Sequence, residues 1–300
     1  MYLAPDEAAG QLFTLRDWLR YAVSRFEQAG LFFGHGTANS YDEAVWLTLA
    51  SLHLPHDTLD NFLDAVLTAP ERRQLAHLIE RRVSERVPVA YLVREAWLGD
   101  FRFYVDERVI VPRSFIAELL REQLSPWVEN PEEVVSVADL CTGSGCLAIL
   151  AAHAFPNAEV DAVDISDDAL AVARRNIADY GLQHRVTAIR SDMLSALAGK
   201  QYDIILSNPP YVDAPAMDAL PREYRHEPGI ALASGSDGLA HTHALLREAA
   251  AHLHPGGLLV VEIGHNREVL EAAYPERSFI WLETSSGDQF VFLLKREQLL

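Results

Sequence analysis

The stretch VVSVADLCTGSGC, residues 134–146, joins an apolar run to a glycine-rich turn. The apolar run predicts a β-strand over residues 134–140. Gly143 and Gly145 let the backbone turn tightly and approach a ligand closely. A helix is predicted directly afterwards, and its first N–H groups would face the same ligand. The stretch therefore predicts a strand, a ligand-binding loop and a helix in succession.

Strands and helices continue to alternate after this stretch. Further strands are predicted at residues 159–165, 186–190, 202–207, 258–263, 279–283 and 289–294, and Ser166 is the predicted N-cap of a helix. Repeated units of this kind favour a parallel sheet with helices on both faces. Only the turn 285–288 separates the last two strands, so they should pair antiparallel. This Rossmann-like α/β sheet of seven strands with an antiparallel C-terminal hairpin resembles a class I methyltransferase.

Two acidic positions follow the glycine turn at strand ends. Asp164 lies 19 residues beyond Gly145, where a carboxylate can accept hydrogen bonds from both hydroxyls of a ribose. Asp192 follows the third strand, and its carboxylate could accept a hydrogen bond from an adenine amino group. Because Gly143-x-Gly145-x-x-Ala148 also satisfies the dinucleotide fingerprint, the loop alone leaves NAD and S-adenosylmethionine open.

The stretch ILSNPPYV, residues 205–212, ends a buried strand with an amide, two prolines and a tyrosine. In a doubly wound sheet this strand should lie beside 134–140, which puts Asn208 at the crevice where ligands bind. The Asn208 side-chain oxygen and the Pro209 carbonyl can each accept a hydrogen bond from one N–H of a planar NH2 group, and proline has no competing N–H. Tyr211 can stack on the flat acceptor. The motif therefore predicts a methyl transfer to an amide or amino nitrogen.

The first part of the chain has a different pattern, typical of a helical bundle. Apolar residues recur at helical spacing from Leu12 to Phe26, and Gly30 ends that run. Helices are also predicted from Tyr41 to about Leu52 and from Pro70 onward. Residues 97–112 alternate like a β-ribbon and Ser114 to Leu124 like a helix. We therefore predict a helical domain (1–96), a ribbon-and-helix linker (97–125) and a catalytic domain (126–300).

Composition excludes several classes of function. The chain has 25 basic and 43 acidic residues, a net charge of −18, which argues against stable binding of nucleic acid. A basic protein partner and simple solubility explain this charge equally well. Two cysteines do not make a disulfide framework. MYLAPDEAAG, residues 1–10, lacks the pattern of a signal peptide, and no apolar run is long enough to span a membrane. We expect a cytoplasmic protein.

Along essentially its whole length, the chain resembles the protein-glutamine N-methyltransferases of the HemK type. The resemblance rests on GHGT (34–37), VDERVIVPRS (105–114), DLCTGSGC (139–146), VDAVDIS (160–166), NPPYVD (208–213), EYRHEP (223–228) and LASGSDGL (232–239). One branch of that family modifies the Gly-Gly-Gln loop of peptide release factors, and another modifies the large-subunit ribosomal protein L-three. Cys141 stands where the release-factor branch usually has glycine, and residues 114–118 differ from its usual Pro-Glu-Thr-Glu run. The resemblance therefore favours the L-three branch.

The resemblance also implies roles for individual residues. It implies that the helical domain recognises the substrate, that S-adenosylmethionine is the methyl donor and that no metal takes part. The acceptor glutamine would be held by Asn208, Pro209, Pro210 and Tyr211. The cofactor would be bound by Asp139, Cys141, Thr142, Gly143, Ser144, Gly145, Asp164, Ile165, Ser191, Asp192 and Asn208. The substrate pocket would include Phe101, Phe103, Arg113 and Glu227, for which packing or loop structure is the alternative.

Other functions stay open at this stage. A release-factor methyltransferase is the nearest rival, and an adenine-N6 DNA methyltransferase would share the Asn-Pro-Pro-Tyr chemistry after flipping its base. A non-catalytic S-adenosylmethionine-binding assembly factor belongs to a different class. If the substrate is L-three, the acidic charge predicts that the two meet before ribosome assembly, because ribosomal RNA would repel the enzyme.

Overall fold

The computed structural model describes residues 3–300 and divides into two units. The first unit comprises the chain up to Ala96 together with Pro221–His226, and the second comprises Trp97–Leu220 and Glu227–Leu300. The prediction made for residues 1–10 rests in part on Met1 and Tyr2, which lie outside the described residues. No helix within residues 3–300 has both the length and the apolar composition needed to cross a bilayer.

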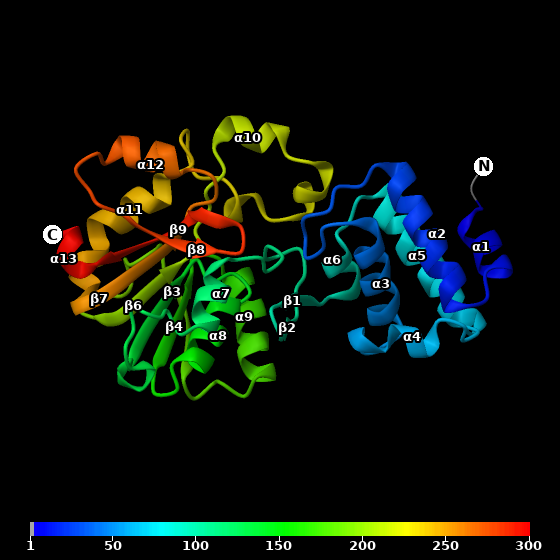
Figure 1. The fold of residues 1–300 in the computed structure, drawn as a ribbon, viewed down its shortest axis with the longest axis horizontal. Helices are drawn as coiled ribbons and strands as arrows, with labels where there is room; N and C mark the ends of the chain where they lie inside the picture. The colour runs from blue at the N-terminus through cyan, green and yellow to red at the C-terminus, as the bar shows by residue number, and fades with distance from the viewer. Residues whose placement is uncertain (1–2) are drawn as a thin grey trace. The chain divides into compact units, whose positions relative to one another are not determined.

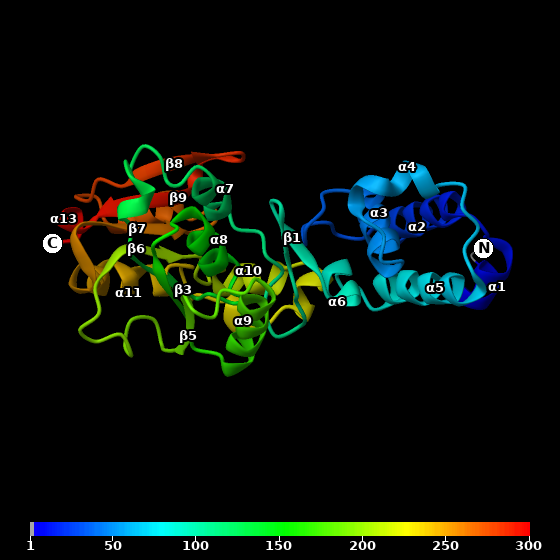
Figure 2. The ribbon, with the colours of Figure 1, turned by 90° about the horizontal axis from the view of Figure 1, so that it is seen from below.

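The second unit is built on a seven-stranded sheet in the order β5-β4-β3-β6-β7-β9-β8, whose two edges can be followed in Figure 2. Its strands are β3 (Ser136–Leu140), β4 (Glu159–Asp164), β5 (Val186–Arg190), β6 (Tyr202–Ser207), β7 (Leu253–Glu262), β8 (Ile280–Thr284) and β9 (Gly287–Lys295). The first five are parallel, whereas β9 pairs antiparallel with both β7 and β8. The predicted sheet, its antiparallel ending and the pairing of β6 with β3 are confirmed.

Helices cover both faces of this sheet (Figure 1). One face packs against α7 (Ile116–Arg121), α8 (Cys146–Ala154) and α9 (Asp167–Asp179), and the other against α11 (Ala240–Glu248), α12 (Arg267–Ala273) and α13 (Arg296–Leu299). Successive residues of a strand point to opposite faces. Val137 and Ala138 of β3 accordingly enter the two different cores, so the strands are apolar on both sides.

Helix α9 follows the sequence signals closely. The Ser166 hydroxyl caps it by accepting from the Ala169 N–H at 3.2 Å, and acidic residues occupy the first turn, where the helix dipole favours negative charge. Gly181, with φ +68°, lies just beyond its last turn. Its apolar stripe of Leu170, Ala173 and Ile177 is buried as predicted.

The first unit is a helical bundle. Its helices are α1 (Pro5–Gln11), α2 (Leu15–Ala29), α3 (Ser40–Ser51), α4 (Leu59–Phe62), α5 (Ala69–Ser84) and α6 (Val89–Val93), with the 3-10 turns η1 (His56–Thr58) and η3 (Arg222–His226). The Thr14 hydroxyl caps α2 by accepting from the Asp17 N–H, and Gly30 ends it in the left-handed conformation. The turn η3 comes from a segment far along the chain, which no local pattern indicated.

The ribbon is shorter than the sequence pattern predicts. Only β1 (Ala96–Leu98) and β2 (Phe101–Phe103) pair, and residues 104–115 have no regular structure. Val109 and Val111 are buried, but the Val111 N–H donates to the Glu227 carboxylate at 2.9 Å instead of to a strand. The alternating apolar pattern of the sequence therefore reflects an irregular segment with one side buried. Short elements that complete the unit are η2 (Pro131–Glu133), α10 (Ala214–Ala219), η4 (Gly229–Ala231) and η5 (Ala249–His252).

Candidate active site

The loop between β3 and α8 is held in a tight left-handed path. Cys141, Gly143 and Gly145 all have positive φ, and the Thr142 N–H donates to the Val163 carbonyl of the adjacent strand at 2.9 Å. A Cβ on Gly145 would lie 3.2 Å from the Cβ of Ala173 in α9. Glycine is therefore required at position 145 by both its φ and the close approach of α9.

Asp164, at the end of β4, fixes the outer part of this loop. Its Oδ2 accepts from the Gly143 N–H and its Oδ1 from the Ser166 N–H, both at 2.9 Å. Burial raises the pKa of Asp164, and these backbone donors oppose that rise. Each carboxylate oxygen has two lone-pair sites, so Asp164 can still accept hydrogen bonds from the hydroxyl groups of a ligand.

A pocket opens at the carboxyl ends of β3, β4, β5 and β6. Its empty space of about 780 Å³, open mouth included, is within the range of small-molecule sites. Eight of the predicted residues line it: Cys141, Gly143, Asp164, Ile165, Ser191, Asp192, Asn208 and Pro210. Further lining residues, which the sequence analysis did not identify, are Arg108, Val109, Ile110, Pro228, Ile230, Ala231 and His241. We call this space the larger pocket.

Asp139, Thr142, Ser144 and Gly145 do not line the larger pocket, so their predicted contact with the cofactor stays a prediction. The fully buried Asp139 accepts from the Thr142 hydroxyl at 2.5 Å and from the Ala148 N–H at 3.0 Å, both through Oδ2. Its Oδ1 has no hydrogen-bond partner within residues 3–300. Burial raises the pKa of Asp139 to about 7. In this structure Asp139 shapes the loop from the inside.

The Asn-Pro-Pro-Tyr segment continues directly from β6. The Ser207 hydroxyl donates to the Leu140 carbonyl at 2.9 Å and so joins the ends of β6 and β3. A smaller pocket of about 230 Å³ follows, lined by Ile110, Arg113, Asn208, Pro209, Tyr211, Val212, Ala231 and Leu232. The Tyr211 ring packs over Gly264, where a Cβ would lie 2.7 Å from the ring. Because Asn208 lines both pockets, ligands in the two would meet beside its side chain.

Arg113 and Glu227 form an ion pair at the smaller pocket. Both Glu227 carboxylate oxygens accept from the Arg113 guanidinium, at 2.5 and 2.7 Å. Arg113 lines the smaller pocket, whereas Glu227 is buried behind it. The ribbon rings of Phe101 and Phe103 line neither pocket. Both pack against Tyr180, the residue that caps the C-terminus of α9. Their predicted part in the substrate pocket stays a prediction.

His241 is a pocket residue that the sequence analysis missed. It lies in α11, and its Nδ1 is 2.9 Å from the Ser234 hydroxyl. Burial lowers the pKa of His241, while Asp192 and a backbone hydrogen bond with Pro210 act to raise it. The only sequence signal near it was the stretch 232–239, which marked a loop and not a ligand-facing histidine.

The sheet, the glycine loop with its acidic partner and the Asn-Pro-Pro-Tyr segment together define a class I methyltransferase. The family described as "Methyltransferase small domain" matches residues 117–221. The solved catalytic domain of hMettl16, in complex with the MAT2A 3'UTR hairpin 6, aligns over 77% of this chain and 84% of its own, with a TM-score of 0.50 and 12% identity. That likeness concerns the fold alone.

Sequence relatives define the family more narrowly. The chain is 60% identical to the ribosomal protein uL3 glutamine methyltransferase of Neisseria gonorrhoeae over 295 residues, which cover 98% of each chain. The protein of the same description from Bordetella pertussis is 56% identical over 96% of this chain and 97% of its own. The chain belongs to the family of the ribosomal protein uL3 glutamine methyltransferases.

Proposed function

We propose that the protein transfers a methyl group from S-adenosylmethionine to the side-chain amide nitrogen of a glutamine in ribosomal protein uL3, the L-three of the sequence analysis. The observation that carries the proposal is the place of Asn208, at the junction of a cofactor-sized pocket and a smaller one. The relatives named as uL3 glutamine methyltransferases supply the identity of the acceptor.

The larger pocket suits S-adenosylmethionine better than NAD. Two carboxylates, Asp164 and Asp192, line it, and Arg108 is the only arginine or lysine within residues 3–300 that does so. An acidic lining favours a ligand with a sulfonium and an ammonium group and disfavours a pyrophosphate. Asp164 would hold the ribose hydroxyls, Asp192 the adenine amino group, and Gly143 the close backbone contact. When bound, S-adenosylmethionine supplies a methyl group on a positively charged sulfur.

The Asn-Pro-Pro-Tyr segment would orient the acceptor nitrogen. The Asn208 side-chain oxygen and the Pro209 carbonyl would each accept a hydrogen bond from one of its two N–H groups, and Tyr211 would lie against the flat amide. Such orientation can supply several kcal/mol of the barrier, up to about 7–11 in favourable models. The carboxyl groups whose pKa values rise to about 7, Asp139 and Glu262, line neither pocket. Neither carboxyl group is therefore placed to take the proton that the nitrogen must lose once it carries the methyl group, and this proton would pass to water.

Charge supports free uL3 as the form that is methylated. A protein with a net charge of −18 attracts a basic ribosomal protein and is repelled by ribosomal RNA. We therefore place the reaction in the cytoplasm, before uL3 enters the large subunit. Efficient methylation of uL3 within intact large subunits would refute this order of events.

A labelling experiment with three acceptors tests the function. The purified protein is incubated with methyl-labelled S-adenosylmethionine and, separately, with unmodified uL3, a peptide release factor and adenine-containing duplex DNA. Label in uL3 alone is expected. Label in the release factor would keep the reaction and change the substrate, whereas label in DNA would refute glutamine as the acceptor. Binding of S-adenosylmethionine without any transfer would favour a non-catalytic assembly factor.

A further inference from the structure

The segment that follows Asn-Pro-Pro-Tyr leaves the catalytic unit and returns to it. Tyr211 and Val212 line the smaller pocket, Pro221–His226 belong to the helical unit, and Glu227 belongs again to the catalytic unit. We call residues 212–232 the strap. Two buried carboxylates, Glu223 and Glu227, lie only four positions apart on it, and each is bound within a different unit.

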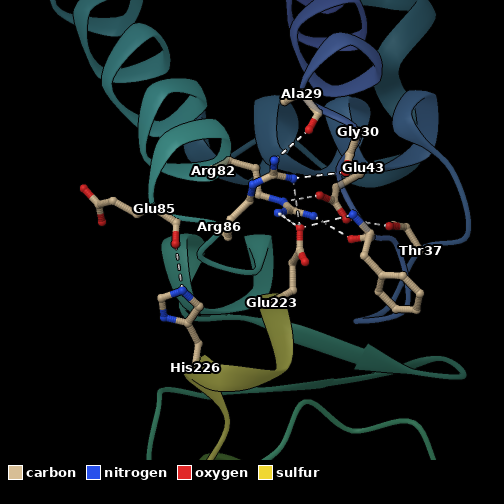
Figure 3. A network of polar contacts seen from close by, with 10 residues as sticks. Ala29, Gly30, Thr37, Glu43, Arg82, Glu85, Arg86, Glu223 and His226 are labelled. Atoms are coloured by element: carbon tan, nitrogen blue, oxygen red, sulfur yellow. Dashed lines mark hydrogen bonds and ion pairs between the residues drawn. The ribbon is translucent and has the colours of Figure 1, made fainter. Parts of the chain in front are cut away.

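Glu223 is held inside the helical unit. Its Oε1 accepts from the Phe32 N–H at 3.1 Å and lies 3.4 Å from the Nη1 atoms of both Arg82 and Arg86 (Figure 3). Burial acts to raise the pKa of Glu223, but the hydrogen bond from Phe32 and the charge of Arg82 outweigh it and lower the pKa. Nearby, His226 Nε2 lies 2.9 Å from the Glu85 carbonyl. Glu223 is therefore an ionised anchor with little exposure to water.

The two arginines are also held by other groups. Arg82 binds the Glu43 carboxylate through Nε at 2.5 Å and the Phe32 carbonyl through Nη2 at 2.9 Å. Arg86 donates to the carbonyls of Ala29 and Gly30 at 2.6 and 3.1 Å, at the end of α2 (Figure 3). We call the pair Arg82 and Arg86 the socket. Both arginines have partners within the helices and loops of the helical unit, and Glu223 is the carboxylate that the strap contributes to them.

The strap builds pocket walls where it returns. Glu227 is fixed by Arg113 and by the Val111 N–H. Four of the next five residues line one or both pockets: Pro228, Ile230, Ala231 and Leu232. The Val212 N–H donates to the Leu232 carbonyl and the Ser234 N–H to the Val212 carbonyl, both at 2.8 Å. These bonds close the strap beside Tyr211.

We infer that Glu223 is a positioning residue for methyl transfer: it fixes the middle of the strap, which leaves residues 227–232 little free chain with which to move away from the two pockets. Glu223 lines neither pocket, so it would act only through the chain. Fixing the backbone of one residue costs about 1–2 kcal/mol of conformational entropy. A strap without the hydrogen bonds of Glu223 would therefore gain conformational entropy by leaving the pockets. The kinetic part of this inference rests on the proposed function, whereas the structural part does not.

Two variants of one network separate anchoring from general stability. Glu223→Gln removes the strap's charge from the socket. Glu43→Gln removes the other carboxylate that binds Arg82, from α3, and leaves the strap's own anchor in place. Should Glu43→Gln not fold, Thr37→Val is the milder control, because it removes only a hydrogen bond to Glu43. Amide hydrogen exchange is measured for all variants of the full-length chain.

In Glu223→Gln, exchange should quicken by about tenfold or more at Val111, Val212 and Ser234, whose N–H groups bond to or within the strap. The control should leave these amides at wild-type rates. With uL3 as acceptor, kcat/KM of Glu223→Gln should fall about tenfold at an unfolding midpoint no lower than the control's. Unchanged exchange in Glu223→Gln, or equal loss in the control, would refute the inference. Exchange needs no acceptor, so this outcome is distinct from failure of wild-type protein to methylate uL3.

Discussion

Arg113 and Glu227 bind each other through two parallel hydrogen bonds, Nη1 to Oε1 at 2.5 Å and Nη2 to Oε2 at 2.7 Å. The Glu227 side chain has no exposure to solvent, whereas the Arg113 side chain is 22% exposed. Arg113→Ala would remove two charge-assisted hydrogen bonds from a buried carboxylate, and should cost about 3–5 kcal/mol of unfolding free energy. Glu227→Gln should cost less, because Arg113 can reach water. Urea denaturation measures both, and the reverse order would contradict this assignment of burial.

Gly145 provides a test of the cofactor loop. Gly145→Ala places a Cβ 3.2 Å from that of Ala173 at a φ of +80°. Gly199 has the same φ, but nothing lies within 4 Å of its added Cβ, so Gly199→Ala carries the backbone cost alone. That backbone cost is about 1 kcal/mol for each variant. Calorimetric titration with S-adenosylmethionine should show at least tenfold weaker binding for Gly145→Ala than for wild type. Gly199→Ala should bind S-adenosylmethionine with wild-type affinity. Equal affinities would mean that the loop tolerates the displacement.

The parts of the fold that local patterns control were predictable from the sequence. The bounds of β5 and β6 agree with the prediction, because each is a short apolar run between turn signals. The parallel order then brings the residues at strand ends together, which is why the sequence alone predicts that Asp164, Asp192 and Asn208 share one edge of the sheet, and all three line the larger pocket.

The remaining pocket walls depend on long-range contacts that no local pattern encodes. Val109 and Ile110 belong to an irregular segment that was predicted as ribbon, and Val111 is bonded to Glu227, 116 positions away. The burial of Glu223 likewise depends on arginines 141 and 137 positions away. Periodicity reports burial of a residue but not its partner, so the course of the strap could not be predicted.

Asp139 should make stability depend on pH. Its carboxyl has a pKa of about 7 in the folded protein against an ordinary value of 3.8, so the native state binds more protons than the unfolded state between these values. The unfolding free energy therefore falls as pH rises from about 4 to 7, by up to about 4 kcal/mol from this group. Glu262, whose pKa burial also raises to about 7, adds a slope of the same sign.

Asp139→Asn should remove the Asp139 part of this slope. Denaturation of wild type and variant at a series of pH values gives the difference directly. Asp179→Asn, which changes an exposed carboxyl group of α9, should leave the slope as it is. A wild-type slope retained in Asp139→Asn would show that Asp139 is ionised throughout the range.

The most direct test of the account follows the methyl group to its acceptor atom. Unmodified uL3 is incubated with S-adenosylmethionine and either wild-type protein or Asn208→Ala, and the products are sequenced by tandem mass spectrometry. We predict one methyl group on a glutamine side chain with wild type. For Asn208→Ala we predict a kcat about 10²–10³-fold lower, by analogy with the loss of one preorganised polar contact, with S-adenosylmethionine still bound. Methylation of another residue type, or an undiminished rate with Asn208→Ala, would contradict the claim that Asn208 orients a glutamine amide for methyl transfer.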